Sequence, residues 1–483
     1  MKRLLTVCII VSAIALFALP AFAEVQNVKV SGDVNSAGVY RNDYDLMQAN
    51  RNNSTYDSTL PDTYSDNNNF LYTQARVRVD ADLTDNVMAT VRLLSEWDWC
   101  TESNTSGDGD NVDIDLANVT LKEAFYSPLT IIVGRQELRY GTGFVVADPD
   151  TNTTSADSNL TATDMSLRKS FDAVRTILDY NPWTIDMIFA KMDESNTTKD
   201  DEDLYGVNVA YMFDNYDAEA EAYWFLNRDD SEVSFGRAAG ETADTNTPGH
   251  TINTFGVRGS MTPAENLNIL GEVAWQRGDF DKISSIKRDQ EAYAFQLAAN
   301  YTLSEITWEP MLRLGYTHYS GEEIDDTGNQ EAWIPLYEDQ THGVVANYIL
   351  GGINGGQNSN AEILNIGASG MPMEDLTVSI DYYKFWLDEK LVSTSNTAIA
   401  RGNRLDWTNL TENSGATGYY YANSDDDLGY EVDLALNYDY TEDVKMGLSA
   451  GWFVPGKALE GEDSDCRNDE TAIQVLATLD VAF

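Results

Sequence analysis

The chain is poor in cysteine, histidine and basic residues for a length of 483. It has three Cys, three His and 31 Lys or Arg, against 79 Asp or Glu. So few cysteines exclude a disulfide framework. The acidic balance argues against nucleic acid as a partner, because phosphate binding needs positive charge. Three histidines without a G-x-S-x-G motif provide little for a general base or an activated nucleophile, so the sequence predicts neither an enzyme nor a bound cofactor.

Long apolar runs are absent beyond the N-terminus. A positive start, Met1–Arg3, precedes the apolar run Leu4–Leu19 and the small-x-small pattern Ala21–Ala23. This order predicts a secretory signal peptide over 1–23, followed by one mature domain over 24–483. No later run reaches the roughly 18 apolar residues of a transmembrane helix. Removal of Lys2 and Arg3 leaves 29 basic residues against 79 acidic ones, a net charge of −50.

Alternation with period two recurs along the mature chain. In residues 71–82 one face carries Leu71, Val77 and Val79, and the other carries Arg76 and Arg78. About 18 such segments of about 10 residues follow one another, the length that a tilted strand needs to cross a bilayer. Short connections alternate with the long polar ones 41–69, 141–167, 229–250, 321–360 and 391–427.

Short turns, long loops and aromatic residues near strand ends are typical of a transmembrane β-barrel. We therefore predict an all-β, antiparallel up-and-down barrel with short periplasmic turns and long extracellular loops. Its place would be the outer membrane of a Gram-negative bacterium, in contact with lipid and lipopolysaccharide. Phe483 ends the last alternating segment and resembles the signal read by the barrel assembly machinery. The alternative, a secreted β-sandwich protein, does not explain the alternating loop lengths.

The basic residues lie within alternating segments, and Arg76 and Arg78 stand opposite the apolar face. A charge on the lipid face near the bilayer midplane costs about 2–4 kcal/mol, so these arginines are expected to face the lumen. Neighbouring strands lie about 4.8 Å apart, so the basic side chains would form one wall that binds a passing anion. Pairing with lumen acids, without any solute, is the alternative. The predicted pore-lining residues are Arg76, Arg78, Arg92, Lys122, Arg135, Glu137, Arg139 and Arg175.

Two features of the polar connections remain open. Asp108, Asp110, Asp113 and Asp115 resemble a calcium loop, since oxygen ligands at alternate positions suit that ion, but the glutamate of an EF-hand is missing. A solvated acidic loop is the alternative. Cys8 leaves with the signal peptide, and Cys100 and Cys466 fall on the long-loop side near the first and last strands. The sequence allows two alternatives: Cys100 and Cys466 form a disulfide, or both remain free thiols.

The stretch "GRQELRYG" (134–141), followed by "RKSFDAVR" (168–175), resembles the alginate export family of outer-membrane proteins. The resemblance implies a monomeric 18-stranded barrel whose arginine-lined constriction passes a polyuronate from periplasm to exterior. Arg135 matches the arginine of the family motif, and Glu137 matches its paired acid. The connection after Gly141 departs from the family in being rich in Asp, Asn and Thr.

The resulting functional hypothesis is an outer-membrane channel for passive passage of an anionic solute, such as a polyuronate polysaccharide. One alternative is a general or cation-preferring diffusion porin, with its selectivity set by the acidic loops. Another is a barrel that surrounds a periplasmic or haem-bearing partner. The chain has no C-x-x-C-H motif of its own, so a redox role would need that partner.

Overall fold

The structure is a computed structural model. It describes residues 27–44, 46, 67–99, 112–149, 163–194, 201–229, 250–283, 286–321, 329–353, 358–390, 425–459 and 470–483. The predicted signal peptide 1–23 lies outside these residues, as do Cys100, Asp108, Asp110 and Cys466.

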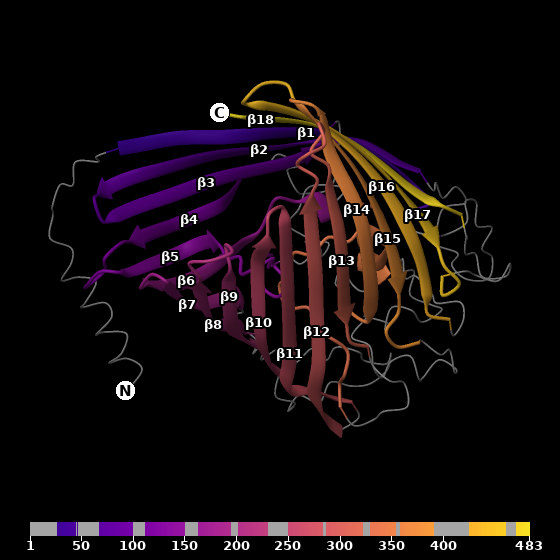
Figure 1. The fold of residues 1–483 in the computed structure, drawn as a ribbon. Coiled ribbons are helices and arrows are strands. Elements are labelled where there is room, and N and C mark those ends of the chain that lie inside the picture. Colours follow the sequence, from indigo (N-terminus) through magenta and orange to yellow (C-terminus); the bar gives the residue numbers. More distant parts are fainter. Residues whose placement is uncertain are drawn as a thin grey trace.

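One 18-stranded antiparallel sheet closes on itself, because β1 pairs with both β2 and β18 (Figure 1). The prediction of an up-and-down barrel is therefore confirmed. Closure leaves no strand edge unpaired, which a sheet in lipid requires. The strands are β1 (Asn27–Asn42), β2 (Asn67–Thr84), β3 (Val87–Asp98), β4 (Asp113–Leu121), β5 (Leu129–Glu137), β6 (Ser170–Asp179), β7 (Trp183–Asp193), β8 (Glu202–Met212), β9 (Glu219–Asp229), β10 (Thr251–Ala264), β11 (Leu267–Ile283), β12 (Ile286–Thr302), β13 (Met311–Tyr319), β14 (Ala361–Met373), β15 (Leu376–Trp386), β16 (Asp427–Asp439), β17 (Val444–Pro455) and β18 (Ala472–Ala482).

The alternation in sequence separates an outer from an inner face. On β2 and β3, Val77 and Val91 are exposed, whereas Gln74 and Glu96, on the opposite face, are buried. Exposed apolar side chains are stable on a surface that lipid covers, and the inner face keeps the polar groups. Among the described residues, no helix is both long and apolar enough to span a membrane.

Connections at the two ends of the barrel differ in length as expected, with one exception. Only two residues separate Thr84 from Val87 and three separate Asp179 from Trp183 at the short-turn end. At the other end, the connection between Tyr319 and Ala361 is the longest. The exception is β11 and β12, which continue as a 17-residue pair and meet at Ile283 and Ile286 on the long-loop end.

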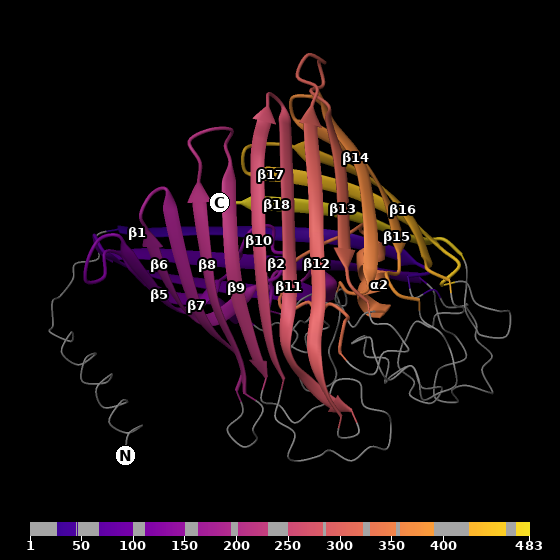
Figure 2. The ribbon, with the colours of Figure 1, turned by 60° about the horizontal axis from the view of Figure 1, so that its bottom comes forward.

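Two inward-folded segments fill part of the lumen. We call residues 138–148, after β5, and 329–353, between β13 and β14, the lumen plug. The second segment contains the helix α2 (Ala346–Ile353), which Figure 2 shows beside the long-loop ends of β13 and β15. A parallel bridge joins the two segments at Val146 and Tyr337. Both segments belong to connections that the sequence predicts as long polar loops, and no sequence pattern predicts that they fold inward.

The plug is held by an apolar core that it shares with the barrel wall. Phe144, Trp333 and Ile334 of the plug are fully buried and pack with wall residues such as Phe171 and Phe225. Phe144 stacks on Trp333 at 6.1 Å between ring centroids.

This core takes residues from the inner faces of β6–β18, whereas β1–β5 contribute no strand residue to it. The inner faces of β2 and β3 are polar: the segment 165–168 covers Gln74 and Glu96, and Arg78 remains open to the lumen.

Candidate functional site: the lumen wall

Arg76, Arg78 and Arg92 face the lumen from β2 and β3, as the alternation predicts. Arg78 stands directly opposite Arg92 in the register of the two strands. Arg76 donates from Nε to both carboxylate oxygens of Asp33 at 3.0 Å. Arg78 binds Asp80 on its own strand at 2.8 Å and leaves 40% of its side chain exposed. The wall therefore combines basic residues with an acid beside each one.

Arg92 is enclosed more tightly than its neighbours. It forms ion pairs with both Asp115 and Glu137, and only 10% of its side chain is exposed. Ser170 donates a hydrogen bond to the other oxygen of Asp115 at 3.0 Å. An arginine held by two carboxylates has little freedom to bind a third anion. Glu137, predicted as a pore-lining acid, is a partner of Arg92.

The same contacts bear on the calcium-loop hypothesis. Asp113 and Asp115 lie in β4, where Asp113 pairs with Arg168 and Asp115 with Arg92. Both carboxylates are therefore engaged by guanidinium groups. The other two proposed ligands lie outside the described residues, so calcium binding by this loop stays a prediction.

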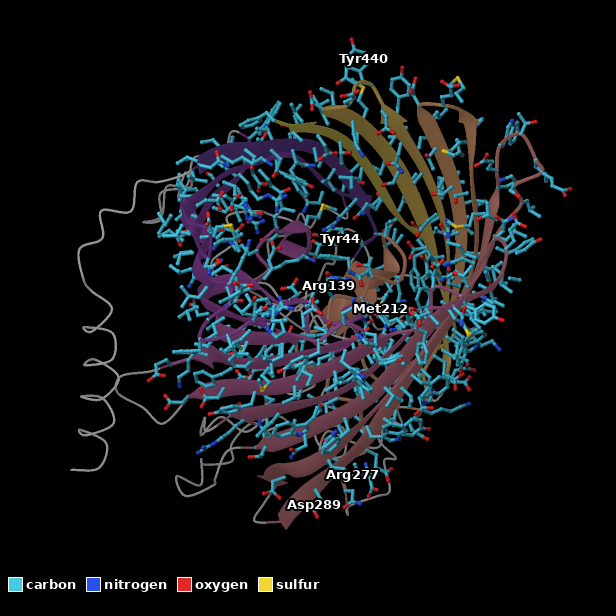
Figure 3. All side chains as sticks on the ribbon, turned by 60° about the vertical axis from the view of Figure 1, so that its left-hand side comes forward. Tyr44, Arg139, Met212, Arg277, Asp289 and Tyr440 are labelled. Atoms are coloured by element: carbon cyan, nitrogen blue, oxygen red, sulfur yellow. The ribbon has the colours of Figure 1, made fainter. Side chains whose placement is uncertain are left out.

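Arg139 lies at the plug, where β5 has ended and the chain turns inward. Its Nη1 donates to Asp339 at 2.5 Å, while Lys169 donates to the other oxygen of Asp339 at 2.6 Å. Burial opposes ionisation of Asp339, but the hydrogen bonds from Lys169 and Arg139 outweigh it and lower the pKa of this carboxyl. Arg139 keeps 52% of its side chain exposed, and Figure 3 shows it within the ring of strands.

Sequence reasoning missed several lumen cations, of which Arg41 is the most informative. Arg41 binds Asp164 at 2.7 Å and lies 4.3 Å above the ring of Tyr348 in α2. Tyr44 also contacts Tyr348, at 5.5 Å between ring centroids. The plug therefore reaches from the core across to β1 and narrows the passage. Arg41 was assigned to a loop because β1 extends farther than its alternation indicated.

Arg135 was expected in the lumen, and this expectation is wrong. Arg135 binds Asp172 across β5 and β6, with Nη2 to Oδ2 at 2.7 Å. Val133 and Val174, the next opposed pair on that face, are exposed apolar residues. Phe171, which points the other way, belongs to the buried core inside the barrel. Arg135 and Asp172 thus lie on the outer face.

The position of Arg135 along the strand explains why this is tolerated. β5 ends at Glu137, two residues beyond Arg135, so the charge lies near the interface, where its cost falls to about 0–1 kcal/mol. On the same outer face, Asp172 stands opposite Lys191 of β7, and Lys191 binds Asp203 of β8 at 2.9 Å. The family resemblance implied that Glu137 pairs with Arg135. In the structure the acid that pairs with Arg135 is Asp172.

Lys122 and Arg175 also differ from the expectation of one open basic wall. Lys122 follows the last residue of β4, Leu121, and lies exposed in the short turn. Arg175 does face inward, on the face opposite Asp172, but it binds Asp186 at 2.5 Å and lies 5.7 Å from the ring centroid of Tyr140 in the plug. The plug thus covers Arg175.

Buried carboxyl groups anchor the plug to the wall. Glu431 of β16 accepts hydrogen bonds from the backbone N–H groups of Val345 and Ala346, at 2.7 and 2.6 Å, at the start of α2. Glu338 of the plug is fully buried and accepts from the Gln340 N–H at 2.6 Å and the Asn358 side chain at 2.9 Å. Burial raises the pKa of Glu338 to about 8.

Gln276 of β11 attaches the plug through its amide. The amide donates to the carbonyl of Ile334 at 2.5 Å and accepts from the N–H of the same residue at 2.9 Å. These buried hydrogen bonds and the apolar core hold the segment against the wall, so it narrows the lumen as an ordered part of the fold.

The lumen wall therefore has two kinds of arginine. Arg92 and Arg175 are enclosed by carboxylates and the plug, so they stabilise the wall. Arg78 and Arg139 belong to exposed ion pairs, which contribute only about 0–1 kcal/mol each. Arg78 already binds Asp80 through two parallel hydrogen bonds, at 2.8 and 3.0 Å, so another carboxylate would have to displace that partner.

Comparisons with known proteins agree with the barrel. A family model described as Alginate export matches residues 40–472. No curated protein matches the chain. The fold is similar to that of OccD1 (OprD), with a TM-score of 0.51 and 9% identity over 95% of this chain and 97% of that one. It is also similar to two Pseudomonas aeruginosa structures. For OccK9 (OpdG) the TM-score is 0.51, with 9% identity over 95% of this chain and 99% of that one. For OpdQ the TM-score is 0.50, with 10% identity over 95% of this chain and 100% of that one. The chain belongs to the alginate export family and forms an outer-membrane channel.

Proposed function

We propose that the channel passes an anionic polysaccharide of the polyuronate type, whose carboxylates bind in turn to Arg78, Arg139 and Lys169. The observation that supports this proposal is the exposure of these cations beside the constriction. Arg139 and Lys169 share the carboxylate of Asp339, and Lys169 also lies 3.6 Å from Asp148, so two cations face two carboxylates here and Arg139 keeps half of its side chain open to the lumen. The description of the family as alginate export agrees with a polyuronate.

A second candidate function is a cation-preferring diffusion porin. Its support is that every predicted lumen arginine found on the inner face has a carboxylate partner, including Asp33 for Arg76 and Asp80 for Arg78. A wall of neutralised pairs exerts a weak field on a passing ion. In that case the acidic connections would set the selectivity.

The two candidates are separated by channel recordings in planar bilayers, with an oligouronate added as a blocker. Arg78→Gln together with Arg139→Gln should raise the half-blocking concentration at least about tenfold, the loss expected for one charge-assisted hydrogen bond. The variant should also shift the reversal potential in a KCl gradient toward potassium.

Arg135→Gln is the matched control, because it removes an equally exposed arginine from the outer face of the same barrel. It should leave both the block and the reversal potential unchanged. If the double variant is blocked as well as the wild type, or if Arg135→Gln weakens the block equally, the arginines do not bind the solute in the lumen. Potassium preference of the wild type without block would favour the diffusion porin.

A further inference from the structure

His318, Glu362 and Asp388 gather on the outer face of the barrel at its long-loop end. His318 lies next to the end of β13, Glu362 is the second residue of β14, and Asp388 follows β15 by two residues. His318 pairs in register with Phe295 on one side and Glu362 on the other. The alternation along β13 sets His318 on the same face as Leu312 and Leu314, which are exposed.

The imidazole of His318 is held in place without hydrogen bonds. Its ring stacks between Tyr293 and Phe295, each at 5.1 Å between centroids with an interplanar angle of 24°. Only 5% of the residue is exposed, and Nε2 has no hydrogen-bond partner among the described residues. Burial without a partner at Nε2 is costly, and among the described residues the polar groups near the ring are those that face Nδ1.

That other nitrogen, Nδ1, points at two carboxylates across a gap. Nδ1 lies 3.7 Å from Oε1 of Glu362 and 3.8 Å from Oδ1 of Asp388, and the three ligand atoms all lie within 4.8 Å of one another. In a direct ion pair these atoms would approach to about 2.7–2.9 Å. Ligands around a tetrahedral Zn²⁺ lie about 3.3–3.5 Å apart, given bonds of about 2.0–2.2 Å. The two distances from Nδ1 are within a few tenths of an ångström of the latter, and the two carboxylate oxygens lie within 4.8 Å of each other.

We propose that His318, Glu362 and Asp388 bind a Zn²⁺ ion. One imidazole with two carboxylates suits zinc better than calcium or magnesium, which take oxygen ligands alone. Asp388 is oriented for this role, because its Oδ2 accepts from the N–H of Gly321 at 2.7 Å and so directs Oδ1 at the histidine. Partners of this kind fix the ligands of metal sites.

The ion would join two long connections at the residues where they meet the strands of the barrel. Gly321 is the second residue of the connection that contains the lumen plug, and Asn360 is its last. The side-chain carbonyl of Asn360 accepts from the N–H of Glu389 at 2.8 Å, next to Asp388. Zinc at this place would therefore link β13, β14 and the connection after β15 at the point where the plug leaves the wall.

Isothermal titration of EDTA-treated full-length protein in detergent with zinc sulfate tests this proposal. Excess calcium is included to saturate acidic loops. The wild type should bind one equivalent of zinc, and His318→Asn should bind it at least about tenfold more weakly, since even indirect partners of a metal contribute about 10–100-fold in affinity. His250→Asn is the matched control, because His250 is also buried and lies 3.6 Å from one carboxylate, that of Asp229.

Asp388→Asn and Glu362→Gln repeat the test if His318→Asn does not fold, which the heat-dependent shift of the barrel in gel electrophoresis would reveal. X-ray absorption of the zinc-loaded wild type should show one imidazole nitrogen with oxygen ligands. The proposal would be overturned by any of three results. The folded site variants could bind zinc with wild-type affinity, His250→Asn could lose as much zinc affinity as they do, or X-ray absorption could show only oxygen ligands around the zinc.

Discussion

At the scale of single residues, the state of a charged group depends on what covers it more than on which strand carries it. Arg78 and Arg92 are direct neighbours in register, yet one is open to the lumen and the other is held between two acids. Arg135 has an exposed partner, but on the outer face. For this reason, counting arginines in a barrel sequence does not measure its selectivity.

Glu338 gives a prediction at this scale because it is buried in the plug and has a pKa of about 8, raised by burial. The folded plug favours the protonated acid, so this contribution to plug stability is complete below the ordinary pKa of about 4.5 and is lost as pH rises through 8. We expect conductance of the wild type to rise between pH 7 and pH 9 as the plug loosens. Glu338→Gln, which stays neutral, should remove that rise. A variant with the wild-type pH profile would contradict the role of Glu338.

At the scale of elements, the sequence predicted the strands well and the plug not at all. Alternation identified the inner face of β2 and β3 correctly, because each residue of a regular strand takes its side from its neighbours. The prediction for Arg135 failed because its charge was taken to require the lumen, whereas alternation sets Arg135 on the same exposed face as Val133, near the end of β5. No local pattern in a polar connection shows whether it folds outward or back into the lumen, since that choice depends on residues such as Trp333 meeting a distant core.

We therefore expect that the plug can lose its packing against the wall while the barrel stays folded. Trp333 is fully buried between the plug and the wall, and Trp333→Ala should cost about 3–5 kcal/mol of plug stability. The 18 strands pair with one another around the closed sheet without the plug. We expect the variant to keep its heat-dependent shift in gel electrophoresis while its single-channel conductance rises about twofold or more, as the lumen opens. Trp183→Ala, at an exposed tryptophan on the outer face of the wall, is the control and should leave conductance unchanged. Loss of the folded barrel in Trp333→Ala would show that plug and wall form one cooperative unit.

At the scale of the whole molecule, charge is distributed unevenly along the passage. The acidic stretches 322–326, 423–427 and 461–465 all fall in or next to connections at the long-loop end, whereas the exposed arginines lie within the lumen. In sequence, the acidic charge therefore belongs to the connections at the long-loop end, where an anion would meet a field of its own sign. Such fields extend about 10 Å at 0.1 M salt and about 3 Å at 1 M salt.

This asymmetry makes the effect of divalent cations depend on the side to which they are added. Calcium on the long-loop side should bind or screen the acidic connections and raise the chloride-to-potassium permeability ratio by roughly twofold at low ionic strength. Calcium on the short-turn side should act more weakly, because the plug separates that side from the acidic mouth. Reversal potentials of oriented channels at 0.1 M and 1 M KCl provide the measurement, and the effect should vanish at 1 M. Equal responses from the two sides would mean that the lumen wall alone, with its neutralised arginines, sets the selectivity.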